Sequence, residues 1–441
     1  MSLALVGGTV LVALHPPAVV RADLLIDGGR IAALGGVPTG TPTRDCSGCL
    51  IIPGNVNGHT HIYSALARGM PYRLDPPANF LQILQRVWWR LDRALDEESI
   101  RASALLGGME ALLSGTTTLI DHHASPNAID GSLDILADAF ARLGVRSILC
   151  YEVTDRDGPE RAHAGIEENR RFLRTQQPLT RGLAGAHASF TMSPETLAGC
   201  VEVARQSRSG MHIHVAEDLA DEADAQARFG RRVVQRLEDA GALDERAILA
   251  HCVHVDEGEI AAIRERGATV AHNARSNMNN AVGRARVGAL GERVVLGTDG
   301  IGGDMFAESQ AAYWRAREDD VFLTIAWPLE RLAPTARVAS RIFEEPQLGR
   351  IEAGAPADLT VLAYDPPTPL HEGNLAGHWI FGLSARYVRD VLVAGEMVVT
   401  GGRLAKVDQD GLIAEAAVEA ERVWRRLEEI PPHTFTPAGV A

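Results

Sequence analysis

Lysine is almost absent from this chain of 441 residues: Lys406 is the only one, and arginine supplies the other basic charge. A Walker A phosphate loop, a Schiff-base lysine and a carboxylated lysine that bridges two metal ions all need a lysine, and residues 1–405 contain none. The sequence therefore argues against P-loop nucleotide hydrolysis, imine catalysis and a lysine-bridged pair of metal ions.

Other absences bear on location and partners. No stretch reaches the roughly 18 apolar residues of a membrane-spanning helix, and the first residues lack the basic segment of a signal peptide. Asp and Glu outnumber Lys and Arg by 57 to 43, which disfavours binding to nucleic acid or anionic lipid through charge. We expect a cytoplasmic protein with a small-molecule substrate and without nucleic acid or membrane partners.

Cysteine is scarce, and its five positions are scattered through the chain. An odd number in a long sequence does not indicate a secreted disulfide framework, so we expect reduced thiols. Cys46 and Cys49 form a Cys-x-x-Cys pair, which can mark a metal or redox site. Because zinc sites of this kind need four ligands and no second pair or histidine lies nearby, we interpret this pair as part of a turn.

The periodicity changes along the chain. Residues 1–54 and 349–406 alternate short apolar runs with Gly, Pro and Asp, which is typical of short strands joined by turns. These two ends could share one β module. Residues 55–348 alternate strand-like with helix-like segments, a pattern that indicates parallel βα units. Residues 407–441 are expected to form a carboxyl-terminal helix and a surface tail.

Eight candidate strands lie within residues 55–348, and they predict an α/β protein with a (β/α)8 TIM-type barrel. They span residues 55–61, 116–123, 145–153, 183–190, 211–217, 247–254, 269–275 and 293–299. Several of them end in His, Asp or Glu. Because the carboxyl ends of the strands form the active-site face of such barrels, we expect the chemistry to gather there.

A set of metal ligands stands at these strand ends. His59 and His61 are two residues apart on one strand, so both side chains point to the same face. His214 and Asp299 end two other strands. Three imidazoles and a carboxylate predict one divalent ion, zinc first and iron as the alternative. His212 shares a strand face with His214 and is a rival ligand, which we place one layer deeper in the barrel.

Two further residues are candidates for catalysis together with Asp299. Glu217 follows His214 by three residues and can reach a metal-activated water as a general base, although a helix N-terminal carboxylate is the simpler alternative. His251 ends its strand and could polarise the substrate, whereas His254 is expected to leave the barrel mouth. His272 has a strong alternative as a packed strand residue, and we leave it out of the site.

The segments PGNVNGHTH, HVAE, ILAHCVHVDEGEI, AHNARSNMNN and VVLGTDG resemble the amidohydrolase superfamily over nearly the whole chain. Within it, the sequence is similar to the branch of cytosine, guanine and S-adenosylhomocysteine deaminases and triazine hydrolases, most closely to the aminohydrolases designated SsnA. The resemblance implies a mononuclear metal centre with the ligands and catalytic residues given above. It also implies that His187 touches the substrate and that residues 1–54 and 349–406 form a composite β-sandwich domain beside a barrel of residues 55–348.

Strand ends supply the candidate substrate contacts, which are His122, His187, Arg275 and Asn277, with Trp88 or Trp89 as a cap over the mouth. The two tryptophans have a strong alternative as packing anchors. Of the pair His122 and His123, the first is expected to face the site and the second solvent or a loop. Such a lining suits planar N-heterocycles.

We therefore expect a metal-dependent amidohydrolase, a hydrolytic deaminase of a purine, pterin, pyrimidine or triazine, which attacks its substrate with a metal-bound hydroxide. Ring opening of a cyclic amide and dechlorination of a heteroaromatic ring remain open, since the same nucleophile can attack either centre. The alternative outside enzymes is a catalytically silent metal-binding scaffold, which the glutamate beside the ligands argues against. A homo-oligomer, dimer or larger, is expected.

Overall fold

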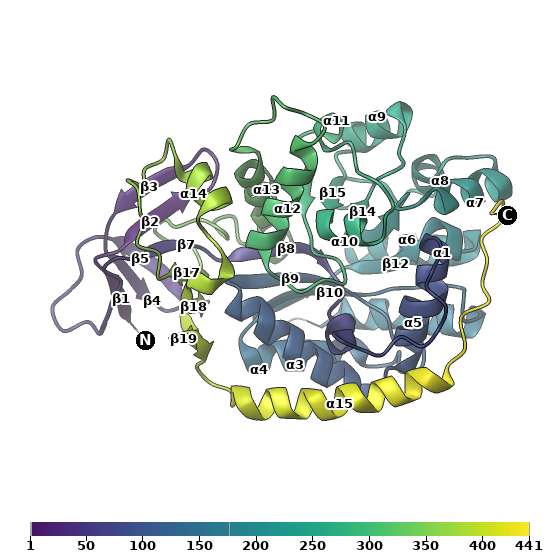
Figure 1. Ribbon diagram of the computed structural model, residues 1–441, viewed down its shortest axis with the longest axis horizontal. Coiled ribbons are helices and arrows are strands. Elements are labelled where there is room, and N and C mark those ends of the chain that lie inside the picture. The colour runs from purple at the N-terminus through teal and green to yellow at the C-terminus, as the bar shows by residue number, and fades with distance from the viewer. Residues whose placement is uncertain (1, 176, 441) are drawn as a thin grey trace.

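The computed structural model describes residues 2–175 and 177–440. Figure 1 shows a helix-covered barrel that forms most of the molecule, with a smaller β-rich part beside it at the amino-terminal end. In the described residues, no helix combines the length and the apolar character needed to cross a membrane.

Eight parallel strands form the barrel. One sheet has the order β11-β10-β9-β8 and another the order β12-β13-β14-β15-β16. Parallel bridges between Val153 and Ala186 and between Thr60 and Asp299 join these sheets at both edges and close the barrel. The fold is therefore α/β and of the TIM type, as predicted. Its strands are β8 (Asn55–Thr60), β9 (Thr116–His123), β10 (Arg146–Tyr151), β12 (Ala184–Ala188), β13 (Met211–Val215), β14 (Ile248–His251), β15 (Thr269–His272) and β16 (Val294–Leu296), with β11 (Thr180–Gly182) at the edge of β10.

Side chains that point into the barrel fill it in layers, as close packing requires. An apolar layer contains Val56, Ile120, Ile148, Ile248 and Val295. Nearer the carboxyl ends of the strands the interior becomes polar, with His59 and His122 fully buried, and His212 of β13 is buried beside them. The apolar layer thus supports a polar layer from which functional groups project.

Capping residues set the limits of several barrel helices. Asp96 and Ser99 form a capping box at the start of α3 (Glu97–Leu113), and Asp256 and Glu259 form another at α9 (Glu257–Arg266). Gly267 ends α9 in the left-handed conformation. The other helices between the strands are α4 (Ser132–Leu143), α5 (Pro159–Phe172), α6 (Pro194–Ser207), α7 (Leu219–Phe229), α8 (Val233–Asp239), α10 (Ala274–Asn279), α11 (Val287–Leu290), α12 (Met305–Arg317) and α13 (Trp327–Phe343).

The smaller part combines both ends of the chain. In its seven-stranded sheet, of order β20-β19-β18-β17-β7-β2-β3, β7 (Leu50–Pro53) pairs antiparallel with β17 (Leu359–Leu362). A second sheet has the order β5-β4-β1-β6. Cys46 and Cys49 lie in the turn between β6 and β7, as expected, and all five cysteines are free thiols. The remaining elements are β1 (Leu3–Val6), β2 (Thr9–Ala13), β3 (Ala18–Arg21), β4 (Leu24–Asp27), β5 (Arg30–Leu34), β6 (Thr43–Asp45), β18 (Val388–Val393), β19 (Glu396–Thr400), β20 (Arg403–Leu404) and α14 (Leu375–Phe381).

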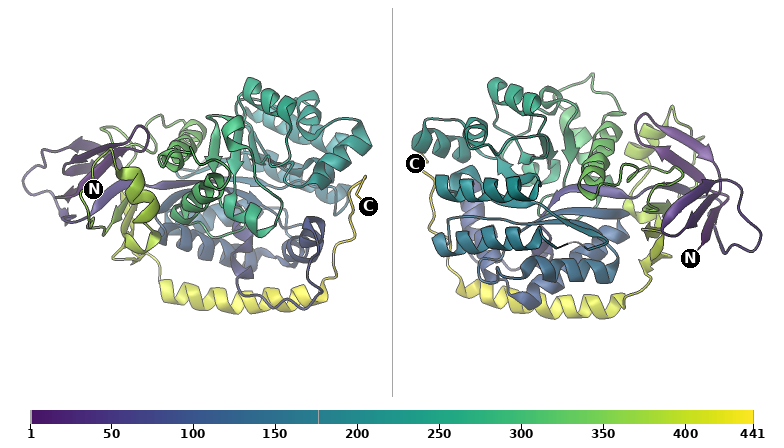
Figure 2. Two further views of the ribbon diagram at one scale, coloured as in Figure 1. Left: turned by 45° about the horizontal axis from the view of Figure 1, so that its top comes forward. Right: turned by 180° about the vertical axis from the view of Figure 1, so that it is seen from behind.

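A long carboxyl-terminal helix, α15 (Gln409–Glu429), runs along the outside of the barrel and continues into a tail (Figures 1 and 2). Arg422 Nη2 donates to Asp96 Oδ1 at 2.6 Å and so ties α15 to the start of α3. The tail then lies beside α1 (Phe80–Ile83) and the π-helical turn η2 (Leu84–Trp88). There the side chain of Gln85 donates to the carbonyl of Phe435 at 2.8 Å. The expected surface tail thus packs against the segment that forms one wall of the site.

Candidate active site

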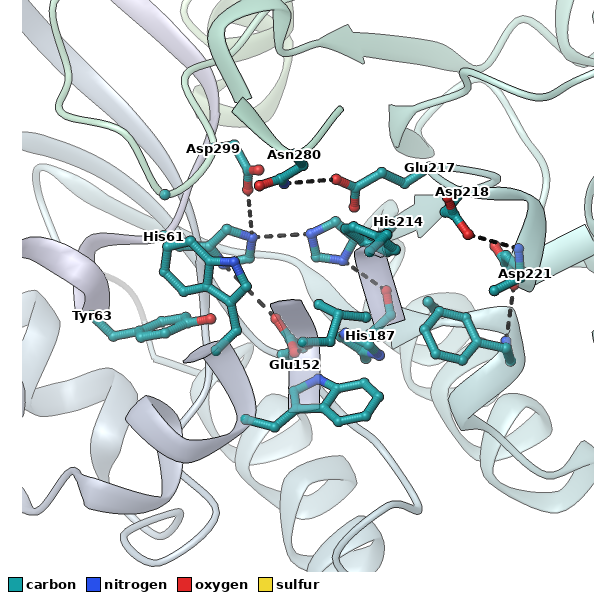
Figure 3. Close-up of a pocket in the computed structure, with 18 residues that line it drawn as sticks. His61, Tyr63, Glu152, His187, His214, Glu217, Asp218, Asp221, Asn280 and Asp299 are labelled. Atoms are coloured by element: carbon teal, nitrogen blue, oxygen red, sulfur yellow. Dashed lines mark hydrogen bonds and ion pairs between the residues drawn. The ribbon is translucent and has the colours of Figure 1, made fainter. Parts of the chain in front are cut away.

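The carboxyl end of the barrel holds a cavity of about 660 Å³, counting the space that opens to solvent. Strand ends contribute its charged and polar groups, and residues 80–91 contribute aromatic and aliphatic side chains. Figure 3 shows the side chains that line it. Its principal ionisable groups are His61, Glu152, His187, His214, Glu217 and Asp299.

The four predicted metal ligands come together at the base of this cavity. His61 Nε2 lies 3.0 Å from His214 Nε2 and 3.0 Å from Asp299 Oδ1 (Figure 3). His59 Nε2 lies 3.4 Å from the same carboxylate oxygen. Ligand atoms of His59, His214, Asp299 and the neighbouring His251 are all within 4.8 Å of one another. These distances bring the lone pairs of three imidazoles and one carboxylate to a common point.

Hydrogen bonds on the far side of each ring orient these imidazoles. His61 Nδ1 donates to the carbonyl of His122 at 2.6 Å, and His214 Nδ1 donates to the carbonyl of His187 at 2.8 Å. A neutral imidazole that donates through Nδ1 keeps its Nε2 as an acceptor or metal ligand. In the neutral form that binds a metal, the Nε2 atoms of His61 and His214 would therefore present two lone pairs 3.0 Å apart.

His59 gives the clearest sign that a cation belongs here. Its Nδ1 lies 2.8 Å from Nε2 of His212, which stands one layer deeper, as predicted. Its Nε2 is buried and has no hydrogen-bond partner among the described residues. An unpaired buried nitrogen is costly unless something binds it, and oriented imidazoles beside a carboxylate suit a divalent ion. The residues present thus fit the expected metal.

Asp299 completes the donor set. Burial alone would raise the pKa of this carboxyl group, but its contacts with His59 and His61 hold the pKa well below the usual range. The hydroxyl of Ser276 donates to the other carboxylate oxygen, Oδ2. An ionised, oriented carboxylate is the form that coordinates metal ions.

The backbone at these strand ends is strained. Ala216, His251, Cys252 and Asp299 have φ angles of 46°, 74°, 50° and 54°, in the left-handed region that residues with a Cβ rarely adopt. They follow or end β13, β14 and β16, where the chain turns sharply into the loops. Such strain persists only where the surrounding structure enforces it, and it gathers at functional sites.

Glu217 lies just beyond β13 and points across the cavity rather than into the ligand cluster. Its Oε2 is 3.5 Å from His251 Nε2, and its Oε1 accepts from the side chain of Asn280 at 3.2 Å (Figure 3). Burial raises its pKa to about 7, an effect that the nearby Asp299 carboxylate strengthens. A carboxyl group that titrates near neutrality can both accept and return a proton.

His251 is held by a buried amide. Its Nδ1 donates to Oδ1 of Asn277 at 2.7 Å, and its Nε2 faces Glu217 and, at 4.0 Å, Asp299. Asn277 lies on α10 and is buried, and it is not among the residues that line the cavity. The structure therefore places Asn277, expected as a substrate contact, behind a candidate catalytic histidine.

The other expected contacts separate into two groups. His187 and Trp88 line the cavity, and the Trp88 ring packs so closely on Gly300 that a Cβ there would come within 2.8 Å of it. His122 is fully buried behind the cavity wall. Arg275 turns away from the site, because its Nε donates to Glu308 at 2.6 Å. Packing against residues that are distant in the sequence determines which of these side chains point into the cavity.

Four histidine and tryptophan side chains outside the metal set also have defined environments. His123 is fully buried rather than exposed, and its Nε2 lies 3.0 Å from the hydroxyl of Ser125 in the following loop. His254 leaves the barrel mouth, as expected, and pairs with the carbonyl of Val282. His272 is a buried strand residue, and Trp89 is buried and lines the cavity.

Glu152 was not predicted from the sequence, although it is a charged residue of the cavity. It lies just after β10, within the segment predicted as the third barrel strand. The same rule that identified His214 and Asp299, a polar side chain at the carboxyl end of a barrel strand, applies to Glu152. The aromatic residues Phe80 and Phe190 also line the cavity, and their sequence context carries no comparable signal.

A TIM-type barrel whose strand ends present three oriented imidazoles, a carboxylate and a buried glutamate defines a metal-dependent hydrolase. Residues 50–398 match the family model described as the amidohydrolase family. The chain therefore belongs to the amidohydrolase family, and it is a hydrolase of carbon–nitrogen bonds. The resemblance predicted from the sequence is confirmed.

Sequence similarity to two named relatives covers almost the whole chain. A 5'-deoxyadenosine deaminase of Methanopyrus kandleri is 32% identical, over 96% of this chain and 99% of its own. A 5-methylthioadenosine/S-adenosylhomocysteine deaminase of Desulforudis audaxviator is 31% identical, over 92% and 95%.

Solved structures share the fold. An adenosine deaminase of Xanthomonas campestris with bound zinc has a TM-score of 0.81 at 24% identity, over 97% of this chain and 99% of its own. Atrazine chlorohydrolase TrzN of Arthrobacter aurescens TC1, in complex with zinc, has a TM-score of 0.80 at 22% identity, over 95% and 100%. At these identities the likeness establishes the fold.

Proposed function

We propose that the protein is a hydrolytic deaminase of a planar N-heterocycle that uses one divalent ion, zinc first and iron as the alternative. The observation that carries this proposal is the proximity of His59, His61, His214 and Asp299, with a His59 Nε2 that has no hydrogen-bond partner among the described residues, beside the protonatable Glu217. A single ion is proposed because the chain has no lysine at the site that could bridge two. The named relatives, which are deaminases of adenine nucleosides, support the reaction type.

Each residue has a distinct role in this proposal. His59, His61, His214 and Asp299 would hold the ion, which supplies an activated water at neutral pH. Glu217 Oε2 takes a proton from the attacking water and delivers it to the departing amino nitrogen, which leaves as ammonia. His251, oriented by Asn277, stabilises the negative charge that develops when the water oxygen adds to the ring carbon.

The shape of the cavity suits a flat ring. Trp88 and Phe190 contribute aromatic surface to its wall, and the Trp89 ring meets His187 edge to face with ring centroids 6.1 Å apart. Aromatic walls bind planar heterocycles by stacking, and polar groups at the base fix their orientation. Adenine nucleosides are the first substrates to test because the named relatives act on them, followed by pterins, pyrimidines and triazines.

Ammonia release from a panel of these heterocycles by the zinc-loaded and iron-loaded protein tests the proposal. We expect ammonia together with a product that keeps its ring and carries oxygen in place of the amino group. Release of chloride, or a ring-opened carboxylate without ammonia, would replace deamination by one of the alternative hydrolyses. Metal analysis of the purified protein should give about one ion per chain, and activity that requires two would contradict the mononuclear site.

Two further expectations remain proposals. We propose that residues 1–54 and 349–406 form a composite β-sandwich domain, residues 55–348 the catalytic barrel, and residues 407–441 a helix and tail attached to it. We also propose that the chain forms a homo-oligomer, a dimer or larger, in the cytoplasm. Light scattering of the purified protein measures the oligomeric state directly.

A further inference from the structure

Asp221 is a buried carboxylate in the first turn of α7, and the proposed reaction gives it no role. The residue is 3% exposed, and both of its carboxylate oxygens accept hydrogen bonds from backbone N–H groups of other segments. Oδ2 accepts from Ala216 at 2.9 Å, and Oδ1 accepts from Phe190 at 3.0 Å. Asp221 lies on the same side of the cavity as Glu217 (Figure 3). One carboxylate thus joins the segments that follow β12 and β13.

Ala216 comes immediately before Glu217 in the chain, and its backbone conformation needs support. Its φ of 46° lies in the left-handed region, which a residue with a Cβ adopts only at a cost in free energy. Its carbonyl accepts from the N–H groups of Val253 and His254 at 3.1 Å and 2.9 Å, and its own N–H donates to Asp221. The peptide groups on both sides of Ala216 are therefore fixed. They determine the direction in which the Glu217 side chain leaves the backbone.

Phe190 belongs to the aromatic wall of the cavity. It lies in the 3-10 turn η4 (Ser189–Thr191), which follows β12, and its side chain is buried. Arg236 of α8 donates to the hydroxyl of Ser189 at 2.8 Å, so charged side chains hold two successive residues of this turn. Because the N–H groups of Phe190 and Ala216 donate to the same carboxylate, the wall and the segment that carries the base keep a fixed separation.

The two hydrogen bonds favour the charged form of Asp221. Burial raises the pKa of its carboxyl group to about 7, and the two N–H donors act against that shift. An asparagine at this position would keep one acceptor and turn its amide donor toward the second N–H. That N–H would lose its acceptor in a buried environment, which costs free energy and favours movement of its segment. At about pH 8.5 the wild-type carboxylate is ionised, so the comparison is cleanest there.

We propose that Asp221 is a positioning residue for the base Glu217. By accepting from Ala216 and Phe190, its carboxylate sets the direction of the Glu217 side chain relative to a ring stacked on the aromatic wall. Asp221 acts through the backbone, because both of its oxygens are engaged there. This inference rests on the proposed function, in which Glu217 moves the protons. Loss of the Asp221 carboxylate should therefore slow proton transfer and leave the metal in place.

A double-mutant cycle separates the positioning of Glu217 from a general loss of structure. Steady-state kinetics are measured at about pH 8.5 on the zinc-loaded full chain with adenosine, or with whichever heterocycle of the panel is hydrolysed faster. Asp221→Asn should lower kcat by roughly 10- to 100-fold, with a smaller change in KM and an unchanged zinc content. In the Glu217→Gln background the same substitution should change kcat by less than about threefold, because no base is left to position.

Asp224→Asn is the matched control on the same helix. Asp224 is also buried, but its Oδ1 accepts from the N–H of Ala438 in the tail, outside the cavity. This variant should keep kcat within about threefold of the wild type. A loss of kcat in Asp221→Asn that is equally large in the Glu217→Gln background, or equally large in Asp224→Asn, would overturn the proposal. If Asp221→Asn does not fold, Asp221→Ser takes its place in the cycle, since serine ends one bond short of the carboxylate oxygens.

Amide hydrogen exchange tests the same contacts without turnover. In Asp221→Asn, exchange should be faster in the peptides that contain Ala216 and Phe190 and unchanged in β8 and β9. If no heterocycle of the panel is hydrolysed, the proposed function is wrong, whereas faster exchange confined to these two segments would still show that Asp221 holds them. Unchanged exchange at both segments overturns the inference in either case. If ammonia is released but Glu217→Gln keeps its full kcat, the deaminase stands and the positioning role is wrong.

Discussion

Substitution of Asn277 by leucine removes the acceptor that orients His251 while nearly preserving side-chain volume. The 2.7 Å hydrogen bond to His251 Nδ1 is buried, and the neighbouring amide of Asn273 lies farther from this nitrogen, at 3.5 Å. A buried donor that loses its acceptor costs about 1–3 kcal/mol. If this free energy is needed to hold the His251 ring in its catalytic position, the activation barrier rises by the same amount. kcat should then fall by roughly 5- to 150-fold, with a smaller change in KM.

Asn277→Asp serves as the matched variant, since it keeps an oxygen at the position that accepts from His251 and should retain kcat within about tenfold. Steady-state kinetics on the best substrate of the panel, with zinc content measured in parallel, distinguish the roles. An increase in KM with unchanged kcat in Asn277→Leu would place the amide against the substrate instead. Equal losses of kcat in both variants would mean that the acceptor oxygen is not what matters.

The remaining predictions concern the base, the metal and the helix clamp. Glu217→Gln should keep its zinc while kcat falls by on the order of 10²–10⁴, whereas loss of zinc would make Glu217 a ligand. His61→Ala should lose zinc and activity together, and a full zinc content by elemental analysis would contradict its assignment. Burial opposes ionisation of Asp96, but hydrogen bonds from Arg422 and Arg426 hold its pKa below the usual range. The ionised carboxylate therefore contributes to the free energy of unfolding above about pH 4, and this contribution is lost as the pH falls below that value. Thermal melts should therefore show a smaller loss of stability between about pH 5 and pH 2 for Asp96→Asn than for the wild type, and equal losses would refute the clamp.

The barrel could be predicted because its signals are local. Each strand shows a short apolar run, several of these segments end in His, Asp or Glu, and the predicted strand at 116–123 agrees with β9 at both ends. The two-residue spacing of His59 and His61 fixes their common face whatever surrounds them. Strand periodicity and the rule that strand ends form the active-site face were therefore sufficient to bring four distant ligands together.

Side-chain directions beyond the strand ends could not be predicted in the same way. Arg275 and Asn277 are two residues apart at the start of α10, yet one pairs with Glu308 of α12 and the other with His251 of β14. Glu308 is 33 residues from Arg275 in the sequence, and His251 is 26 residues from Asn277. The spacing within one short helix carries no information about which neighbouring element supplies the partner, so both were assigned to the substrate. Only the packed structure decides between them.

The hydrogen bonds of the ligand histidines favour a bound cation. A neutral imidazole has one donor and one acceptor, and in neutral His61 and His214 a backbone carbonyl accepts from the donor on the side away from Asp299. The Nε2 acceptors remain, and that of His61 lies 3.0 Å from both His214 Nε2 and Asp299 Oδ1. His59 Nε2 lies 3.4 Å from the same carboxylate oxygen. Buried acceptors without donors are unfavourable, so this group requires a positive partner from outside the chain, and a divalent ion suits it.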